Sequence, residues 1–316
     1  MLTFHAARRT CAVLITAALA ATAAACSSSS TTTASASAST AGNSASMPGM
    51  GMGPSASPSA TAAGMAGMGM AGDDPMYSGT GLSATSGGFT FAPTTTRLTA
   101  HQPQALHFKI RDAQGAVMTA FVPDQTKMMH FYLIRSDLTG FQHLHPTMAA
   151  DGTWTASLAA LAPGDYRAYV AFNAKNTSGT TVAEVLSSAL TVPGTAAATA
   201  LPAAATTTSV DGYTLTVSGE AMAAMSHILT ITVTKNGKPV TDLQPYLQNY
   251  AHLTAIHAGD LAFAHLHPEG AAAMTDAGGP TLTFNTLLPS SGDWRFFIQF
   301  QTGGVLHTAA ITLHAS

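Results

Sequence analysis

Cysteine is almost absent from this chain of 316 residues, which has two, Cys11 and Cys26, both near the N-terminus. The chain beyond Cys26 therefore offers no disulfide, no thiolate metal site and no cysteine nucleophile. Charge is scarce as well, since only 9% of residues are Asp, Glu, Lys or Arg and the formal net charge is −3. Because no basic stripe is present, we expect no nucleic acid partner. The side chains that remain for metal chemistry include 13 histidines and 15 methionines.

The N-terminal residues have the features of an export signal. Arg8 and Arg9 form a short basic segment, and the apolar stretch 11–25 that follows is short for a membrane span. Three alanines directly precede Cys26, and a run of serines follows it. This arrangement resembles a bacterial lipoprotein signal, which implies removal of residues 1–25 and a lipid on Cys26 that anchors the chain to the outer face of the cell membrane. The alternative is a plain secretory signal cleaved after an Ala-x-Ala motif, and both predict an extracytoplasmic protein.

Residues 26–75 are rich in Ser, Thr, Ala, Gly and Met and show no hydrophobic periodicity. Such a segment buries too little apolar surface to offset its ordering entropy, so we expect a disordered tether. The spacing Met-x2-Met-x-Met occurs twice in it, at Met47, Met50 and Met52 and again at Met65, Met68 and Met70. Thioether sulfur is a soft ligand that selects Cu(I), so this spacing favours weak, exchangeable copper capture. The alternative is a drifting Gly-Met-Ala repeat without a ligand role.

The remainder of the chain contains an internal duplication. A shift of 122 positions, which takes His130 to His252, aligns its two halves without gaps over about fifty residues. The same shift pairs Gly115 with Gly237, Thr119 with Thr241, Pro123 with Pro245, His143 with His265, and His145 with His267. Each copy therefore carries the pattern H-x12-H-x-H-P.

Both copies have the pattern of antiparallel β-structure. Apolar or β-branched runs occur at 88–92, 105–111, 129–135, 140–145, 153–158, 165–172 and 184–192, and in the second copy at 212–217, 227–234, 250–257, 261–267, 281–286, 293–300 and 304–313. Turn motifs such as D-A-Q-G and A-P-G-D separate the runs. About seven short strands in about 100 residues indicate an immunoglobulin-like sandwich. We therefore predict an all-β chain with two tandem immunoglobulin-like β-sandwich domains, at 76–193 and 209–316, joined by a linker at 194–208.

The histidines of the first copy lie on a predicted hairpin. His143 and His145 share a face because residues i and i+2 of a strand do. If a two-residue turn closes at Ser136-Asp137, His130 lies opposite His143 within the cross-strand spacing that a metal ion can bridge. The predicted face then presents four candidate ligands, which are Met128, His130, His143 and His145.

The second copy predicts a similar but not identical site. A turn at Ala258-Gly259 places His252 opposite His265, on the same face as His267. Tyr250 stands where the first copy has Met128, so the two sites need not be equal.

Imidazole with an optional thioether and no thiolate suits copper or zinc. The Met-rich tether and Met128 favour copper, and zinc is the alternative. A competing interpretation makes the histidines structural, bonded to backbone carbonyls or packed at a domain interface. Six histidines have no counterpart in the other copy, and we expect most of them to be surface or core residues: His101, His107, His227, His257, His307 and His314.

Longer segments carry a family resemblance. They are H-F-Y-L-I-R-S-D-L-T-G-F-Q-H-L-H-P-T, D-G-T-W and P-G-D-Y-R-A-Y-V-A-F in the first copy, and V-T-D-L-Q-P-Y-L-Q-N-Y-A-H-L-T-A-I-H-A-G-D-L-A-F-A-H-L-H-P in the second. Over residues 76–316 the chain resembles actinobacterial secreted proteins and lipoproteins with duplicated β-domains, sometimes labelled heavy-metal-binding. The resemblance implies the repeat and export, and it brings no assigned catalytic residues.

These features predict an extracytoplasmic, lipid-anchored metal-binding protein, with copper capture, delivery or tolerance as its function. The alternative is an adhesion or scaffold protein of the cell envelope, with structural histidines and an envelope protein as partner. We expect no enzyme, because no carboxylate near the histidines is common to both copies: Gly259 replaces Asp137. The motifs G-x-S-x-G and H-E-x-x-H are also absent.

Overall fold

The computed structural model describes residues 79–266, 268–269, 275 and 277–316, all of which fall within one compact unit. The expected signal, Cys26, the tether and His267 lie outside these residues, and the side chain of His265 is not described either. The described residues form strands and loops, and no helix among them is long and apolar enough to cross a membrane.

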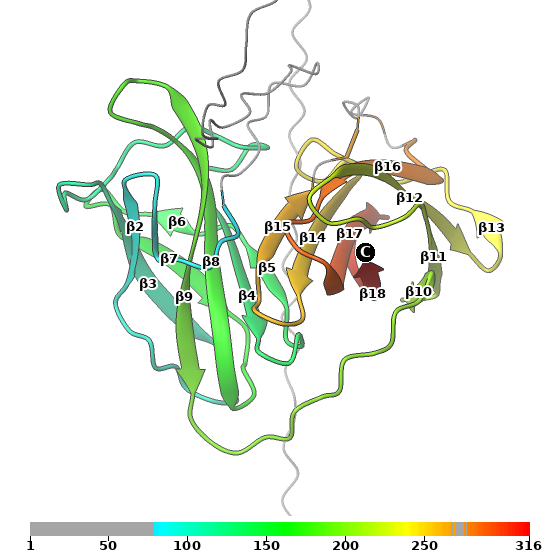
Figure 1. Ribbon diagram of the computed structural model, residues 1–316, viewed down its shortest axis with the longest axis horizontal. Helices are drawn as coiled ribbons and strands as arrows, with labels where there is room; N and C mark the ends of the chain where they lie inside the picture. The colour runs from blue at the N-terminus through cyan, green and yellow to red at the C-terminus, as the bar shows by residue number, and fades with distance from the viewer. Residues whose placement is uncertain (1–78, 267, 270–274, 276) are drawn as a thin grey trace, which may run out of the picture. The chain divides into compact units, whose positions relative to one another are not determined.

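The first copy forms a sandwich of two antiparallel sheets (Figure 1). Its strands are β1 (Thr85–Ser86), β2 (Phe89–Pro93), β3 (Gln104–Arg111), β4 (His130–Arg135), β5 (Gln142–Leu144), β6 (Thr147–Met148), β7 (Trp154–Leu158), β8 (Gly164–Lys175) and β9 (Thr181–Val192). One sheet has the order β1-β2-β3-β7-β6, and the other has the order β5-β4-β8-β9. From β2 onward these orders correspond to the A-B-E-D and C′-C-F-G sheets of an immunoglobulin-like domain.

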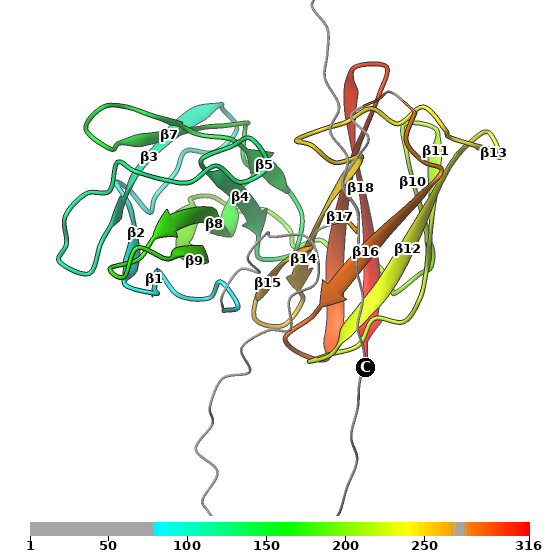
Figure 2. The same cartoon turned by 90° about the horizontal axis from the view of Figure 1, so that it is seen from above.

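The second copy repeats this topology. Its strands are β10 (Thr207–Val210), β11 (Tyr213–Ser218), β12 (Ser226–Lys235), β13 (Lys238–Pro239), β14 (Ala251–His257), β15 (Phe263–Leu266), β16 (Thr281–Leu287), β17 (Gly292–Thr302) and β18 (Val305–Ala315). One sheet runs β10-β11-β12, with β13 and β16 also paired to β12, and the other has the order β15-β14-β17-β18. Figure 2 shows the two sheets as separate layers. The prediction of an all-β fold with two immunoglobulin-like sandwiches is confirmed.

Each predicted run overlaps one observed strand, and the structure adds β1, β6, β10 and β13. None of the four additional strands is longer than four residues. Alternation over two to four residues is too short to be recognised as a strand pattern.

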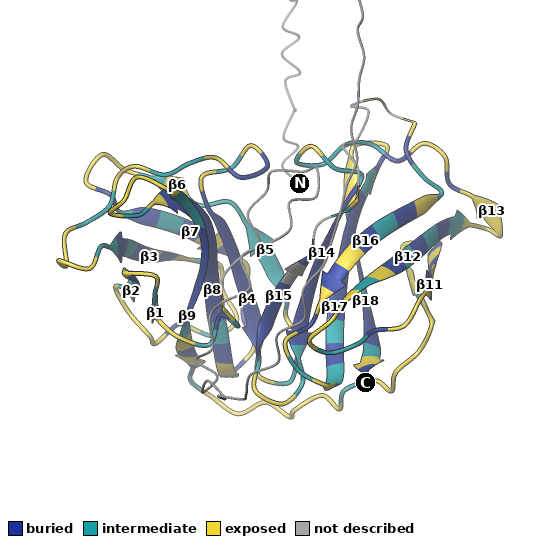
Figure 3. Cartoon of the chain, turned by 45° about the horizontal axis from the view of Figure 1, so that its top comes forward, coloured by how far each residue is buried: buried dark blue, intermediate teal, exposed yellow. Residues whose placement is uncertain are grey.

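Alternation along β3 shows how the core of the first sandwich forms. Leu106, Phe108 and Ile110 are completely buried, whereas His107 between them is exposed, because successive side chains of a strand point to opposite faces. The Phe108 ring stacks on Trp154 of the neighbouring strand, with the ring centroids 6.3 Å apart. Figure 3 shows that most buried residues lie on the strands and that many exposed residues lie in the loops.

A buried aromatic residue makes the same contact near the start of β8 and of β17, the F strands of the two copies. Tyr166 of β8 and Trp294 of β17 are 3% and 0% exposed. The Tyr166 hydroxyl donates a hydrogen bond to the Ala162 carbonyl, and Trp294 Nε1 donates one to the Ser290 carbonyl, both at 2.9 Å. The aromatic residue in P-G-D-Y-R and S-G-D-W-R thus fills the core and also holds the loop before the strand.

A third apolar cluster is built from both copies. It draws on β4, β8 and β9 of the first and on β14, β15 and β17 of the second. The rings of Phe141 and Phe297 stack in parallel with centroids 4.0 Å apart. The Tyr169 hydroxyl donates a hydrogen bond to the Leu261 carbonyl. The C′-C-F-G sheet of each copy therefore packs against that of the other.

The substitution Phe108→Ala should lower the free energy of unfolding by about 3–5 kcal/mol, because it leaves a cavity where this ring packs on Trp154. Urea denaturation followed by circular dichroism would measure the loss. Gln114→Ala, at an exposed loop position of the same copy, should change it by less than about 0.5 kcal/mol. Equal effects of the two substitutions would contradict this description of the core.

Candidate metal centre

The β4–β5 hairpin positions the histidines of the first copy. Tyr132 pairs with His143, so the predicted pairing of His130 with His143 is wrong by two residues. The connection from Arg135 to Gln142 is longer than the predicted two-residue turn, and it includes Leu138 with a positive φ of 63°. A shift of two residues preserves the alternation of faces, so His130 still shares a face with His143.

The second copy shows the same correction. Thr254, rather than His252, pairs with His265. The predicted register is again wrong by two residues. This shift again keeps positions 252 and 265 on the same face of the sheet.

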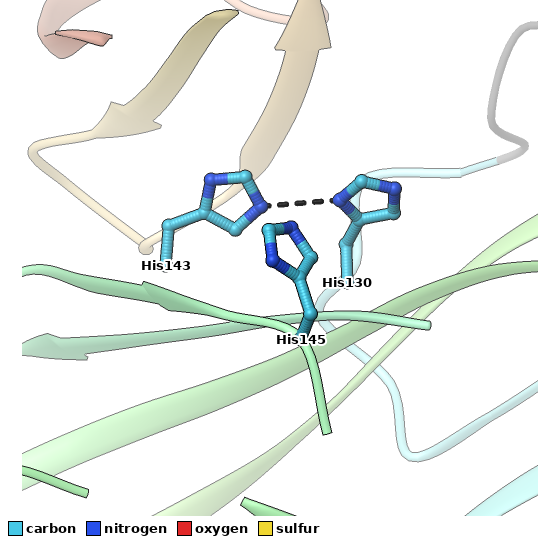
Figure 4. Close-up of side chains that lie close together, drawn as sticks. All are labelled: His130, His143 and His145. Atoms are coloured by element: carbon cyan, nitrogen blue, oxygen red, sulfur yellow. Dashed lines mark hydrogen bonds between the residues drawn. The ribbon is translucent and has the colours of Figure 1, made fainter. Parts of the chain in front are cut away.

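The side chains of His130, His143 and His145 converge (Figure 4). One ring nitrogen of each lies within 4.8 Å of the corresponding atoms of the other two. His130 Nδ1 and His143 Nε2 are 3.1 Å apart. The His145 ring centroid is 5.1 Å from that of His130 and 4.8 Å from that of His143. The structure therefore brings together the three histidines predicted for the first copy, which we call the histidine triad.

Met128 does not occupy the place that the predicted register gave it. In the observed register it no longer faces His145 across the hairpin. Its side chain is on the surface, 46% exposed, whereas His130 is 0% exposed. The strand geometry therefore gives no support to a thioether ligand at this position.

Hydrogen bonds determine which ring nitrogens of His130 and His143 carry protons. His130 Nε2 lies 3.2 Å from the Asp124 carbonyl oxygen, which can only accept. His143 Nδ1 lies 2.6 Å from Gln299 Oε1, and Gln299 Nε2 is directed to Thr308 Oγ1 at 3.4 Å. His130 therefore carries its proton on Nε2 and His143 on Nδ1. The two nitrogens that face each other at 3.1 Å are then both unprotonated.

His145 adds a buried ring nitrogen to the triad. Its Nε2 is buried and has no hydrogen-bond partner among the residues that the structure describes. Leaving such an atom buried costs about 1–3 kcal/mol. A ligand that accepts the nitrogen lone pair would remove that cost.

Burial keeps the imidazoles of His143 and His145 neutral. Burial lowers the pKa of His143 well below its usual value, and His130 and His145 lower it further, against the opposing effect of the Gln299 hydrogen bond. Burial, followed by His130 and Lys127, lowers the pKa of His145 to about 3. Metal ions bind neutral imidazole, so His143 and His145 are in the ligating protonation state at neutral pH.

A strained turn carries the carbonyl that orients His130. Asp124 and Lys127 exchange two backbone hydrogen bonds, of 2.7 and 2.8 Å, and Gln125 and Thr126 between them have φ of 44° and 72°. Positive φ is costly for residues other than glycine, and most of all for β-branched ones such as threonine. The Asp124 carboxylate also approaches His130, with Oδ2 4.0 Å from Nε2.

The same turn recurs at Tyr246–Asn249 in the second copy. Leu247 and Gln248 have φ of 53° and 70°. The Tyr246 carbonyl accepts a hydrogen bond from His252 Nε2 at 2.9 Å. Both copies therefore orient the first histidine of the pattern by a backbone carbonyl six residues earlier. With the side chains of His265 and His267 not described, the geometry of a second site is not defined.

Sequence reasoning missed Asp124 and Gln299 as contacts of the triad. Asp124 lies in the segment P-D-Q, a turn motif that by itself indicates no contact with a histidine. Gln299 interrupts the apolar run of β17 and is 5% exposed. A polar residue inside an apolar strand is the signal that could have identified it, because buried polar groups need partners.

Four of the six histidines outside the pattern make side-chain hydrogen bonds. His257, His307 and His314 each place Nδ1 2.7–2.8 Å from an aspartate oxygen. His107 Nδ1 lies 3.0 Å from Thr155 Oγ1. These contacts agree with the expected surface and core roles.

Comparison with solved structures finds matches to several bacterial proteins. The Escherichia coli adhesin FdeC is 17% identical, with 73% of this chain and 65% of FdeC covered and a TM-score of 0.23. The Yersinia pseudotuberculosis adhesin InvE is 14% identical, with coverage of 74% and 61% and a TM-score of 0.22. Salmonella alpha-2-macroglobulin is 8% identical, with coverage of 76% and 16% and a TM-score of 0.25. The chain spans less than two thirds of the length of each of these three structures.

No curated protein matches the sequence. A domain family does match, at residues 84–188 and again at 208–316, and it is described as Domain of unknown function (DUF8832). The two matches coincide with the two sandwiches and support the duplication found in the sequence. The chain therefore belongs to the DUF8832 family and carries its domain twice.

Proposed function

We propose that this chain is an extracytoplasmic metal-binding protein that holds a transition-metal ion on His130, His143 and His145. The observation that carries the proposal is the pair of unprotonated nitrogens, His130 Nδ1 and His143 Nε2, at 3.1 Å. Two lone pairs that face each other at this distance repel unless a cation lies between them. A proton could fill that place only by charging a buried imidazole, which its environment opposes.

The distances also agree with metal coordination. Zinc binds imidazole nitrogen at about 2.0–2.1 Å, so two nitrogens on one ion lie roughly 2.9–3.4 Å apart for bond angles of about 90–110°. The separation of 3.1 Å between His130 and His143 falls within that range. His145 also offers a ring nitrogen within 4.8 Å of ring nitrogens of the other two histidines.

Copper is the ion we propose, with zinc as the alternative. Three neutral imidazoles suit either metal by ligand type. The repeated Met-x2-Met-x-Met spacing in residues 47–70 adds soft ligands that select Cu(I). A lipid on Cys26 would hold this chemistry at the outer face of the cell membrane, where capture, delivery or tolerance of copper would be the function. We propose no enzymatic activity.

A specific observation also favours the second candidate function, a cell-envelope adhesion or scaffold protein with structural histidines. His143 is bonded to Gln299 of the other copy, and its ring stacks on Tyr132 with centroids 4.4 Å apart. These contacts could fasten the two sandwiches without any metal. An envelope protein would then be the partner.

Metal titration distinguishes the two functions. The wild-type chain should bind Cu(I), Cu(II) or Zn(II), and the double variant His143→Ala/His145→Ala should bind one ion fewer per chain. His314→Ala is the matched control, because that imidazole is 64% exposed and bonds to Asp293 outside the triad. Circular dichroism would check folding, and His145→Ala alone provides a milder variant. If the double variant bound as many ions per chain as the wild type, for all three metals, the result would favour the adhesion or scaffold function.

Bound metal should also raise stability. At a free ion concentration of 100 times the dissociation constant, the folded state gains about 2.7 kcal/mol, provided that the unfolded chain does not bind. Calorimetry should therefore show a higher Tm for the wild type with the ion that binds, and a smaller rise for His143→Ala/His145→Ala. An equal rise in both proteins would place the metal elsewhere in the chain.

The metal-free chain should lose stability as the pH falls. His143 and His145 have pKa values below the ordinary 6.5 in the folded state, so the unfolded chain binds more protons below that pH. Their contribution is fully present above pH 6.5 and is lost as the pH falls from 6.5 towards about 3. Urea unfolding of chelator-treated protein across this window should give a steeper pH dependence for the wild type than for His145→Ala. If the free energy of unfolding of the two proteins depended on pH in the same way, a lowered pKa of His145 in the folded state would be refuted.

A further inference from the structure

We infer that the second sandwich completes the metal centre of the first, with Gln299 as a positioning residue for His143. The inference rests on the proposed function and extends it, because it makes the two copies a single binding unit. It also predicts that metal occupancy and packing between the copies are linked.

The contact that carries the inference joins the two copies directly. His143 Nδ1 and Gln299 Oε1 are 2.6 Å apart, although the residues are 156 positions apart in the chain. Gln299 is 5% exposed, and its amide nitrogen is directed to Thr308 Oγ1. The carbonyl end of the amide therefore faces the imidazole and accepts a hydrogen bond from its Nδ1–H. Partners of this kind fix the tautomer and raise the basicity of a ligating histidine.

The first copy has no equivalent of Gln299. Gly164 and Gly292 begin equivalent strands, so Ala171 of β8 is the counterpart of Gln299. Ala171 pairs with His130 across β4 and β8, just as Gln299 pairs with His252 across β14 and β17. A methyl side chain cannot accept a hydrogen bond. The second copy can therefore orient His143 of the first copy through Gln299. The first copy cannot orient a histidine of the second copy in the same way, because Ala171 has no acceptor atom.

The apolar contact between the copies reaches the same histidine. Tyr132 stacks on His143 and also contacts Phe263 of the second copy, with ring centroids 5.0 Å apart. His252 of the second copy lies near His143 as well, at a centroid distance of 6.2 Å. A shift between the sandwiches would therefore remove contacts that hold the His143 ring in its orientation. By linkage, an ion that holds the triad together must also favour the packed arrangement.

The experiment compares Gln299→Leu, Gln299→Glu and Gln301→Leu in the full chain, with Cu(I) as the probe in competition with a chromophoric chelator. Gln299→Leu keeps the approximate size and removes the acceptor, so it should weaken Cu(I) binding by about 10–100-fold. Gln299→Glu keeps an acceptor oxygen and should retain wild-type affinity. Gln301→Leu is the matched control on the same strand, where the side chain meets Gln244 instead of the triad. It should leave the affinity unchanged.

A second readout does not depend on the metal. Long-range ¹H–¹⁵N spectra of the metal-free chain report which nitrogen of His143 is protonated. We expect the Nδ1–H form in the wild type and in Gln299→Glu, and a mixture of tautomers in Gln299→Leu. A purely structural role for Gln299 would change stability without moving this signal.

The outcomes separate the two proposals. If the wild type binds Cu(I) and Gln299→Leu binds it equally well with an unchanged His143 tautomer, this inference is overturned and the proposed function stands. If the wild type binds none of Cu(I), Cu(II) and Zn(II), both are overturned. Loss of affinity in Gln299→Leu and retention in Gln299→Glu, together with the tautomer change, supports the inference.

Discussion

The arrangement of this protein depends on β4 being buried on both faces. All six of its residues are buried, although a strand of a two-layer sandwich ordinarily exposes one face to water. Phe131 and Leu133 point into the core of the first sandwich, whereas Tyr132 and Ile134 belong to the cluster shared with the second. Every polar group on that second face must therefore find a partner inside the protein. His130 lies on this face, and its environment follows from that constraint.

The shared face has two kinds of polar partner. Backbone carbonyls of the two strained turns orient His130 and His252, at positions that the duplication has kept equivalent. Strained φ values that recur in both copies indicate that surrounding contacts hold the turns in place. The side-chain amide of Gln299 is the other kind, and here the copies differ, since the first copy has Ala171 at the equivalent position. The two copies therefore share the backbone contacts and differ in this side-chain contact.

The same asymmetry bears on the choice between a metal site and a scaffold. A scaffold needs only that the sandwiches stay together, and the stacked pair Phe141–Phe297 would contribute to that in either case. A scaffold role gives no reason for the unprotonated nitrogens of His130 and His143 to face each other. It also gives no reason for the buried Nε2 of His145 to lack a hydrogen-bond partner among the described residues. A metal ion bound as proposed would account for both features, because it would accept the lone pairs of the two facing nitrogens.

The sequence by itself determined the strands, the duplication and the identity of the triad residues. Hydrophobic alternation is a local property, so it predicted β3 and β8 closely, and His-x-His on one strand necessarily projects to one face. Only the tertiary structure decided the hairpin register, because the length of the loop before β5 depends on backbone angles such as that of Leu138. It also decided the partners of the triad. Gln299 lies 156 residues from His143 in the chain, and no local pattern encodes a contact made when two sandwiches pack together.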